Sequence, residues 1–291
     1  MRMIPPLLAG LCDDAALFPP GAVPLAVAVP AHFAHTDSAY ADLVGPLVLP
    51  ATRLAELAAV LGGRVLPVSL TVPGGTDAAA AALGRLRTID AVHLVGLEIA
   101  VPDGQPVPAL LRAVSKICGA APGVAVHVEV PRDRRRDEVL TGLADLGARA
   151  KIRTGGVVAD AYPDEAELAA VIAAAGSLGV PFKATAGLHR AVRNTDADTG
   201  FEQHGFLNLM LATRLAADGA DPDTVAAALA DRDGPGMADT LAGLTEAESA
   251  AVRRRFVSFG TCSIAAPLAD LTALGLVHPP GIPAADERAP A

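Results

Sequence analysis

Residues 124–154 read VAVHVEVPRDRRRDEVLTGLADLGARAKIRT, and this stretch decides the fold. It opens with VAVHVEV, in which every second residue is valine, a pattern typical of a β-strand. A helical stretch follows at 134–146, and ARAKIRT at 148–154 reads as a second strand. The helix between them has a length suited to a crossover, so the stretch predicts one strand-helix-strand unit.

The same alternation runs along the rest of the chain. Helical stretches of similar length, such as 77–87, 106–119 and 164–178, separate short β-rich runs. The predicted strands lie at 24–29, 45–49, 64–72, 91–99, 124–130, 148–154, 180–186 and 256–262. Eight such units in 291 residues predict a (β/α)8 TIM barrel. The alternative is a doubly wound nucleotide-binding sheet, but no G-x-G-x-x-G follows the first strand and no P-loop is present.

One connection is much longer than the others. We predict a single barrel domain over residues 1–280, in which 187–255 form a helical, lid-like insertion between strands seven and eight. Predicted helices lie at 201–217 and 222–230, and Thr245-Glu246-Ala247-Glu248 is typical of a capping box. The Pro/Ala-rich tail, residues 281–291, is expected to be disordered.

Composition narrows the class of protein. Hydrophobic residues make up 52% of the chain and charged residues 19%, which predicts a sizeable core. The formal net charge of −9 argues against a nucleic-acid partner. No apolar run reaches the about 18 residues that a membrane helix needs. Three scattered cysteines, Cys12, Cys118 and Cys262, favour a reducing cytoplasm over a disulfide framework. A homo-oligomer is compatible with the sequence, and no cofactor is expected.

Lysine is scarce. Of the 23 Lys and Arg residues only Lys116, Lys151 and Lys183 are lysines, so arginine supplies the other 20. A guanidinium stays charged near neutral pH, whereas an amine can lose its proton and act as a nucleophile. The lysines in predicted strands are therefore candidates for chemistry.

Strand alternation places the two strand lysines inside the predicted barrel. Since the valines of 124–130 must face the helices, the residues between them point inward. The same argument applies to strands four, six and seven. The predicted inward side chains are His127, Glu129, Lys151, Arg153, Lys183 and Thr185, with Glu98 near the end of the fourth strand.

Two amines on neighbouring strands predict an unusual lysine. Strands lie about 4.8 Å apart, so the ammonium groups are expected close together, and the pKa of one amine is predicted to fall toward neutrality. Such a lysine can form a Schiff base with a carbonyl substrate, while Glu129, Glu98 or His127 moves protons. The alternative is structural, with Lys151 paired to Glu129 and Lys183 paired to Glu98 as buried salt bridges.

Three motifs resemble a known family. Lys151-Ile-Arg-Thr-Gly155, Lys183-Ala-Thr-Ala-Gly187 and Phe259-Gly-Thr-Cys-Ser263 are similar, in order and approximate spacing, to motifs on strands six, seven and eight of the deoxyribose-phosphate aldolase family. That family is a class I aldolase barrel. The resemblance implies that Lys151 forms the Schiff base, that Lys183 lowers its pKa, and that the turn after strand eight holds an anion through backbone N–H groups.

The resemblance also has departures. Ala186 stands where the family has the first glycine of a pair. The family has an aspartate at the end of its first strand, whereas PLAVAV at 24–29 has none, so the acid–base group is expected from Glu98, Glu129 or His127. Asp13 and Asp14 are expected to cap a short helix, or to fold across a barrel end toward the site.

The substrate is expected to be a small carbonyl or sugar-like compound, phosphorylated or otherwise anionic. Candidate substrate-binding residues are Arg153, Thr185, Gly187, His189, Gly260, Thr261 and Ser263. A divalent site built from His127, Glu129, Glu98 and His189 is an alternative, but two ammonium groups would repel the cation.

These candidates favour a Schiff-base-forming carbon–carbon lyase. One alternative is a cofactor-free or metal-assisted sugar isomerase or epimerase, with Glu129 and His127 as its acid and base. The other alternative is a non-catalytic barrel that binds an anionic metabolite.

Overall fold

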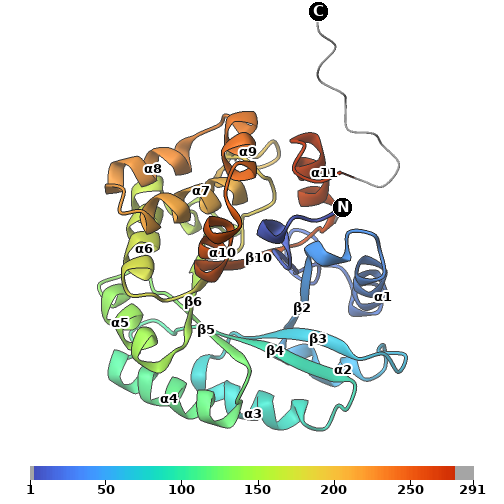
Figure 1. Cartoon of the computed structure of the whole chain (residues 1–291). Helices are drawn as coiled ribbons and strands as arrows, with labels where there is room; N and C mark the ends of the chain where they lie inside the picture. Colours follow the sequence, from blue (N-terminus) through green and yellow to red (C-terminus); the bar gives the residue numbers. More distant parts are fainter. Residues whose placement is uncertain (1–2, 279–291) are drawn as a thin grey trace, which may run out of the picture.

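Eight parallel strands close into a barrel in the computed structural model, which describes residues 3–278 (Figure 1). Their order around the barrel is β1-β10-β7-β6-β5-β4-β3-β2, which confirms the predicted (β/α)8 TIM barrel. The strands are β1 Cys12–Asp14, β2 Val44–Pro50, β3 Leu66–Val72, β4 Val92–Ile99, β5 Ala125–Glu129, β6 Arg149–Arg153, β7 Phe182–Thr185 and β10 Phe256–Thr261. The tail predicted to be disordered, 281–291, lies outside the described residues.

Helices connect the strands and pack against their outer face, since a parallel sheet needs crossover connections. Figure 1 shows α3 to α6 around one side of the barrel. The helices are α1 Leu25–Thr36, α2 Leu54–Leu57, α3 Gly75–Leu86, α4 Val107–Ala120, α5 Arg136–Leu146, α6 Glu165–Ser177, α7 Phe206–Ala217, α8 Pro222–Ala230, α9 Gly234–Ala242, α10 Glu246–Arg255 and α11 Ala265–Ala273. Short 3-10 turns lie at Pro6–Leu8, Ala41–Leu43, Ala51–Arg53 and Ala159–Ala161.

The first strand is not where the sequence pattern suggested. The predicted strand at 24–29 is wrong, because PLAVAV forms the start of helix α1. That helix buries Leu25, Ala28, Val29, His32 and Phe33, which have the i, i+3, i+4, i+7, i+8 spacing of one helical face. Strand β1 is instead the three-residue segment Cys12–Asp14, which pairs with β10 on one side and β2 on the other. This strand is too short, and contains two acidic residues, so it shows no apolar alternation.

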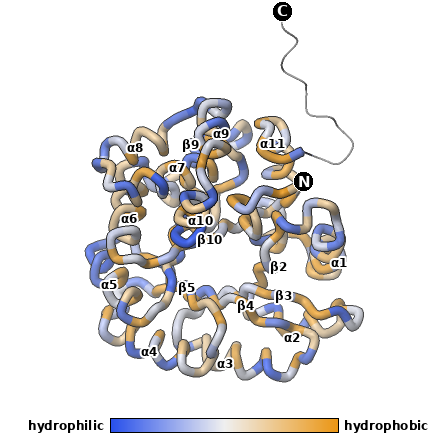
Figure 2. Tube along the Cα trace, viewed as in Figure 1, coloured by the Kyte–Doolittle hydropathy of each residue, from blue (hydrophilic) through white to orange (hydrophobic). Residues whose placement is uncertain are grey.

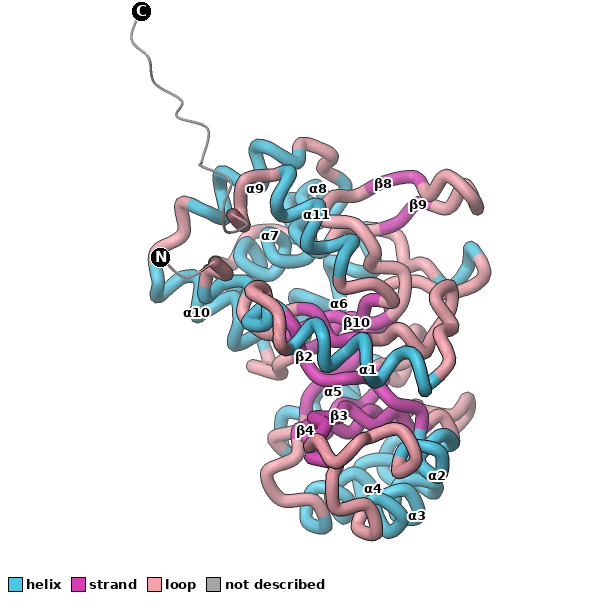
Figure 3. The backbone as a smooth tube through the Cα atoms, turned by 90° about the vertical axis from the view of Figure 1, so that its right-hand side faces the viewer, coloured by secondary structure: helices cyan, strands magenta, loops and turns pink. Residues whose placement is uncertain are grey.

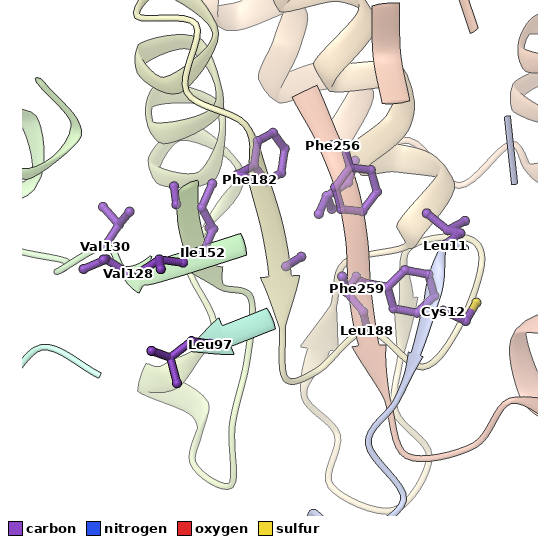
Figure 4. Close-up of a cluster of buried hydrophobic side chains, with 14 of the residues drawn as sticks. Leu11, Cys12, Leu97, Val128, Val130, Ile152, Phe182, Leu188, Phe256 and Phe259 are labelled. Carbon is purple, nitrogen blue, oxygen red and sulfur yellow. The ribbon is translucent and has the colours of Figure 1, made fainter. Parts of the chain in front are cut away.

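The core lies between the strands and the surrounding helices, as the close-up in Figure 4 shows. Phe182 of β7 and Phe256 of β10 stack with ring centroids 5.3 Å apart, and Phe206 of α7 stacks on Phe259 at 4.8 Å. Val126 and Val128 of β5 are buried as predicted. These apolar side chains occupy the outward parity of the strands, which leaves the other parity for the barrel interior.

Additional helices follow β7, as the length of 187–255 predicted. The segment begins with a two-stranded hairpin, β8 Asn194–Thr195 and β9 Glu202–Gln203, which extends to one side of α7–α9 in Figure 3. The predicted capping box is confirmed at the start of α10, because the Thr245 hydroxyl accepts from the Glu248 N–H and the Glu248 carboxylate accepts from the Thr245 N–H.

The helices contain both hydrophilic and hydrophobic residues. Figure 2 shows hydrophilic residues along α5 and α10; consecutive arginines stand at 134–136, where α5 begins, and at 253–255, where α10 ends. Within residues 3–278 no helix is long and apolar enough to cross a membrane.

Candidate active site

A cavity of about 690 Å³ opens at the carboxyl ends of the barrel strands. Residues from the end of every barrel strand or from the loop that follows it line this cavity, including Thr71, Glu98, Glu129 and Gly260. Lys151 and Lys183 lie at its floor. Active sites of TIM barrels occupy this end of the barrel, so the cavity is the candidate active site.

The register of the sheet brings the two lysines together. Lys151 of β6 and Lys183 of β7 are direct partners in the parallel pairing, and Glu129 of β5 is the partner of Lys151 on the other side. All three side chains share the inward parity that the valine alternation predicts. The sequence therefore located this set correctly.

Lys183 is held between two carboxylates. Its Nζ donates to Asp13 Oδ2 and to Glu98 Oε1, both at 2.5 Å, and the residue is 1% exposed. Burial opposes the charge on Lys183, but the attraction of Asp13 and Glu98 outweighs burial and raises the pKa of Lys183 above its ordinary value. Lys183 is therefore the amine that keeps its proton.

Lys151 has looser contacts and faces the cavity. Its Nζ lies 3.4 Å from Glu98 Oε2 and 3.4 Å from Glu129 Oε2, and its side chain is 9% exposed against 2% for Lys183. The two predicted salt bridges, Lys151 with Glu129 and Lys183 with Glu98, are thus both present as contacts. Of the two amines, Lys151 is the one that a small molecule in the cavity can approach more easily.

Glu98 joins the two lysines. Its two carboxylate oxygens contact different amines, and Oε1 also accepts from the Ser69 hydroxyl at 2.7 Å. Burial works against its charge, but Lys183 and Lys151 outweigh burial and hold the pKa of Glu98 well below its usual range. We call the set Asp13, Glu98, Glu129, Lys151, Lys183 and Arg153 the charge cluster.

Glu129 closes the charge cluster on the other side. Its Oε1 accepts from Arg153 Nε at 3.1 Å, while Oε2 faces Lys151. Burial would raise the pKa of Glu129, but Lys151 and Arg153 lower it below its ordinary value. Glu98 and Glu129 are therefore both ionised at neutral pH.

Asp13 belongs to the site, and the expectation that it caps a helix is wrong. It lies on β1, where its Oδ2 accepts from Lys183 and from the Ser258 hydroxyl at 2.8 Å. Burial raises the pKa of the Asp13 carboxyl, although Lys183 acts against that rise. The first strand thus supplies an inward aspartate after all, which the misplaced strand at 24–29 had concealed.

His127 occupies a different position from the one expected of a proton carrier. It is buried inside the barrel, it does not line the cavity, and neither ring nitrogen has a hydrogen-bond partner within residues 3–278. Burial and the nearby charge of Lys183 lower the pKa of His127 to about 3. The imidazole is therefore neutral at pH 7.

The structure divides the predicted substrate-binding residues into two groups. Those that line the cavity are Arg153, Thr185, Gly187, His189 and Gly260. Thr261 and Ser263 do not line it, because their hydroxyls serve the turn: Thr261 Oγ1 accepts from the Ser263 N–H, and Ser263 Oγ accepts from the Ala266 N–H at the start of α11.

The turn after β7 is tight. Ala186 has φ +63° and Gly187 has φ +74°, and the Thr154 hydroxyl donates to the Ala186 carbonyl at 2.6 Å. A Cβ added to Gly187 would lie 2.8 Å from the Tyr162 ring and 2.9 Å from the Gly155 Cα. The glycines of the strand-six and strand-seven motifs therefore allow the two loops to touch.

Two loops that supplied none of the predicted site residues also form the cavity. Phe18 and the Pro19-Pro20 pair line it from the segment after β1. The β8–β9 hairpin adds Asp198, Phe201 and further residues, whereas no residue of α7–α10 lines it. The Phe-Pro-Pro sequence four residues after Asp14 was the available signal for the first of these loops.

His189 and Cys262 meet at the cavity wall, with Nδ1 3.5 Å from Sγ. Burial lowers the pKa of His189 and raises that of Cys262, so both groups are neutral near pH 7. Among the described residues no group of three or more His, Cys, Asp or Glu side chains is arranged to hold a metal ion.

In comparisons with known proteins, no family model and no curated protein matched the chain. The cavity combines a buried, fixed ammonium, a second amine facing the cavity, and ionised carboxylates beside it.

Proposed function

We propose that this TIM barrel is an enzyme, a carbon–carbon lyase that forms a Schiff base between Lys151 and a carbonyl substrate. One observation carries the proposal: two lysines on adjacent strands share Glu98 and line the cavity, but Lys183 is hydrogen-bonded to its carboxylates at 2.5 Å whereas Lys151 lies 3.4 Å from its own. Lys183 keeps its proton and holds Asp13 and Glu98 in place. Barrels with an isolated amine at the catalytic end suit class I aldolase chemistry.

The resemblance to the deoxyribose-phosphate aldolase family supports the same assignment. Its lysine motifs on strands six and seven fall on Lys151 and Lys183, which are paired residues in the sheet. The first-strand aspartate of that family now has a counterpart in Asp13 of β1. We therefore propose an aldolase-like site, without carrying over the substrate of the family.

In the first step, the neutral amine of Lys151 adds to the substrate carbonyl. Glu98 and Glu129, each 3.4 Å from Nζ, are placed to take the proton that the ammonium must lose. One amine proton then moves to the carbonyl oxygen and the carboxylate returns the proton it took, so that the oxygen leaves as water and a protonated imine joins Lys151 to the substrate.

In the second step, the bond between the α and β carbons of the substrate breaks. Its electron pair moves toward the imine nitrogen and forms an enamine, while the hydroxyl on the β carbon loses its proton and becomes an aldehyde. Glu129 or Glu98 accepts that proton and returns it to the enamine carbon. Water then hydrolyses the imine, releases the second carbonyl product and restores the amine.

Borohydride trapping tests the proposal. The protein is incubated with a panel of aldehydes and ketones, reduced, digested and mapped by mass spectrometry. We expect an adduct on Lys151 and none on Lys116, which is exposed on α4 and serves as an internal control for unspecific reaction. Labelling of Lys116 without Lys151 across the panel would contradict the proposal.

A non-catalytic binder is separated from an enzyme by Lys151→Arg. The arginine keeps the positive charge but cannot form an imine. A binder retains its affinity for the carbonyl compound in this variant, whereas the proposed enzyme loses both the adduct and turnover.

A further inference from the structure

The two sides of the cavity differ in chemistry. Residues 15–100, which come from the β1 to β4 side of the barrel, supply a wall that is apolar apart from Thr71 and Glu98. We call this the apolar wall: Phe18, Pro19, Pro20, Val48, Val72 and Pro73. On this side the polar lining residues are Thr71 and Glu98, and Glu98 belongs to the charge cluster at the floor.

The opposite side carries most of the hydrogen-bonding groups, beside the apolar residues Val157, Ala186 and Phe201. The polar wall consists of Arg153, Tyr162, Thr185, His189, Asp198 and Gln203. Lys151 lies at the floor between the two walls. A substrate whose carbonyl reaches Lys151 thus has an apolar surface on one side and polar partners on the other.

The cavity offers little to attract a phosphate. Three cationic side chains line it, Lys151, Lys183 and Arg153, against the four carboxylates Glu98, Glu129, Asp196 and Asp198. All three cations already have carboxylate partners within 3.4 Å. A phosphate monoester carries between one and two negative charges near neutral pH, and it would meet a lining without spare positive charge.

Two of the groups expected to bind an anion have partners within the turn after β10. The Ser263 N–H donates to Thr261 Oγ1 at 3.3 Å, and the Ser263 hydroxyl accepts from the Ala266 N–H at 3.3 Å. His189, which does line the cavity, has a lowered pKa because it is buried. A methyl group stands at Ala186, where a glycine would leave the backbone open to a ligand.

We infer that the substrate is an uncharged carbonyl compound with an aliphatic or aromatic arm. The carbonyl meets Lys151, the arm packs against the apolar wall, and hydroxyl groups of the substrate meet the polar wall. This inference rests on the proposed function, since it takes imine formation at Lys151 as the first step. It adds the chemical class of the substrate and leaves phosphorylated compounds outside that class.

The test measures half-saturating concentrations for borohydride trapping on Lys151. One series is propanal, butanal, pentanal and hexanal; one pair is glyceraldehyde and glyceraldehyde 3-phosphate. Each methylene that reaches the apolar wall is expected to lower the half-saturating concentration about fourfold. Glyceraldehyde is expected to trap at a lower concentration than its phosphate.

Failure of the inference and failure of the proposed function give different results. Tighter trapping of the phosphate, or no gain from propanal to hexanal, overturns the inference while the adduct on Lys151 still supports the lyase. No adduct on Lys151 with any aldehyde overturns both.

A variant of the apolar wall gives a second, independent readout. Phe18→Ser is expected to raise the half-saturating concentration of hexanal at least fivefold and to leave that of glycolaldehyde unchanged, since glycolaldehyde has no arm to pack. Val65→Ser, at a residue that is 63% exposed and outside the cavity, is the matched control. Equal effects of Phe18→Ser on both aldehydes would contradict the placement of the arm; if this variant does not fold, the wild-type aldehyde series decides.

Discussion

Replacing Glu98 by glutamine removes one charge from a balanced set. The charge cluster holds three carboxylates, Asp13, Glu98 and Glu129, and three cations, Lys151, Lys183 and Arg153, with contacts of 2.5 to 3.4 Å between them. Glu98→Gln keeps the shape of the side chain and its hydrogen bond to Ser69, but both lysines lose a shared counter-charge. One positive charge is then left uncompensated in the barrel interior.

The size of the effect follows from burial. Glu98 and Lys183 are each 1% exposed, so water offers little compensation. Removing one partner of a buried pair costs about 3–5 kcal/mol of unfolding free energy. With an unfolding entropy of about 2.1 cal/mol/K per residue, a chain of 291 residues loses about 5–8 °C in its midpoint temperature of unfolding.

The effect depends on pH in a defined direction. The pKa of Glu98 is lowered in the folded protein, so its contribution to stability is complete above the unfolded value of about 4.3 and is lost as the pH falls through the folded value. The difference between wild type and Glu98→Gln is therefore full at pH 7 and shrinks in acid below about pH 4.

Thermal unfolding followed by circular dichroism at pH 7, 4 and 3 measures this difference. Glu56→Gln is the matched control, because Glu56 also contacts a cation at 2.5 Å, but on the exposed surface beside Arg53. That control is expected to change the midpoint little. Equal midpoints for the two variants at pH 7 would refute the view that the charges of the charge cluster balance and are shielded from water.

Three further changes test separate parts of the site. Lys151→Arg should abolish the borohydride adduct while the unfolding midpoint stays close to that of wild type, because the charge remains. Ser258→Ala should cost about 1.5–3 kcal/mol in urea unfolding, since the hydroxyl donates to Asp13 at 2.8 Å; a loss no larger than that of a surface substitution would contradict this bond. Gly187→Ala should lower the midpoint, because φ is +74° and the new Cβ would lie 2.8 Å from Tyr162; an unchanged midpoint would show that the two loops can separate.

The barrel and its lysine pair could be predicted because strand alternation is a strong local signal. The valines of β5 fix which residues face outward, and the same parity places Lys151, Lys183 and Glu129 inside. If neighbouring parallel strands also align in register, the two lysines lie side by side, as they do in the sheet. No long-range information beyond the barrel hypothesis was required.

The first strand could not be predicted in this way. Strand Cys12–Asp14 has only three residues, and all three are buried. It therefore shows no alternation of buried and exposed residues, and its two aspartates prevent an apolar run. PLAVAV alternates by coincidence, and its helical face becomes visible only when His32 and Phe33 are included. The cavity loops were missed for a related reason, because contacts of Phe18 and of the hairpin depend on tertiary structure and not on periodicity.

The placement of Asp13 on the shortest strand also has a consequence for biosynthesis. Asp13 is made 170 residues before Lys183, and β1 reaches its neighbour β10 only when the chain is nearly complete. During translation the ammonium of Lys183 therefore lacks one of its two counter-ions until β1 pairs with β10 and closes the barrel. A nascent chain stalled before Phe256 contains seven of the eight barrel strands, so the barrel should stay open between β7 and β1 until β10 is made.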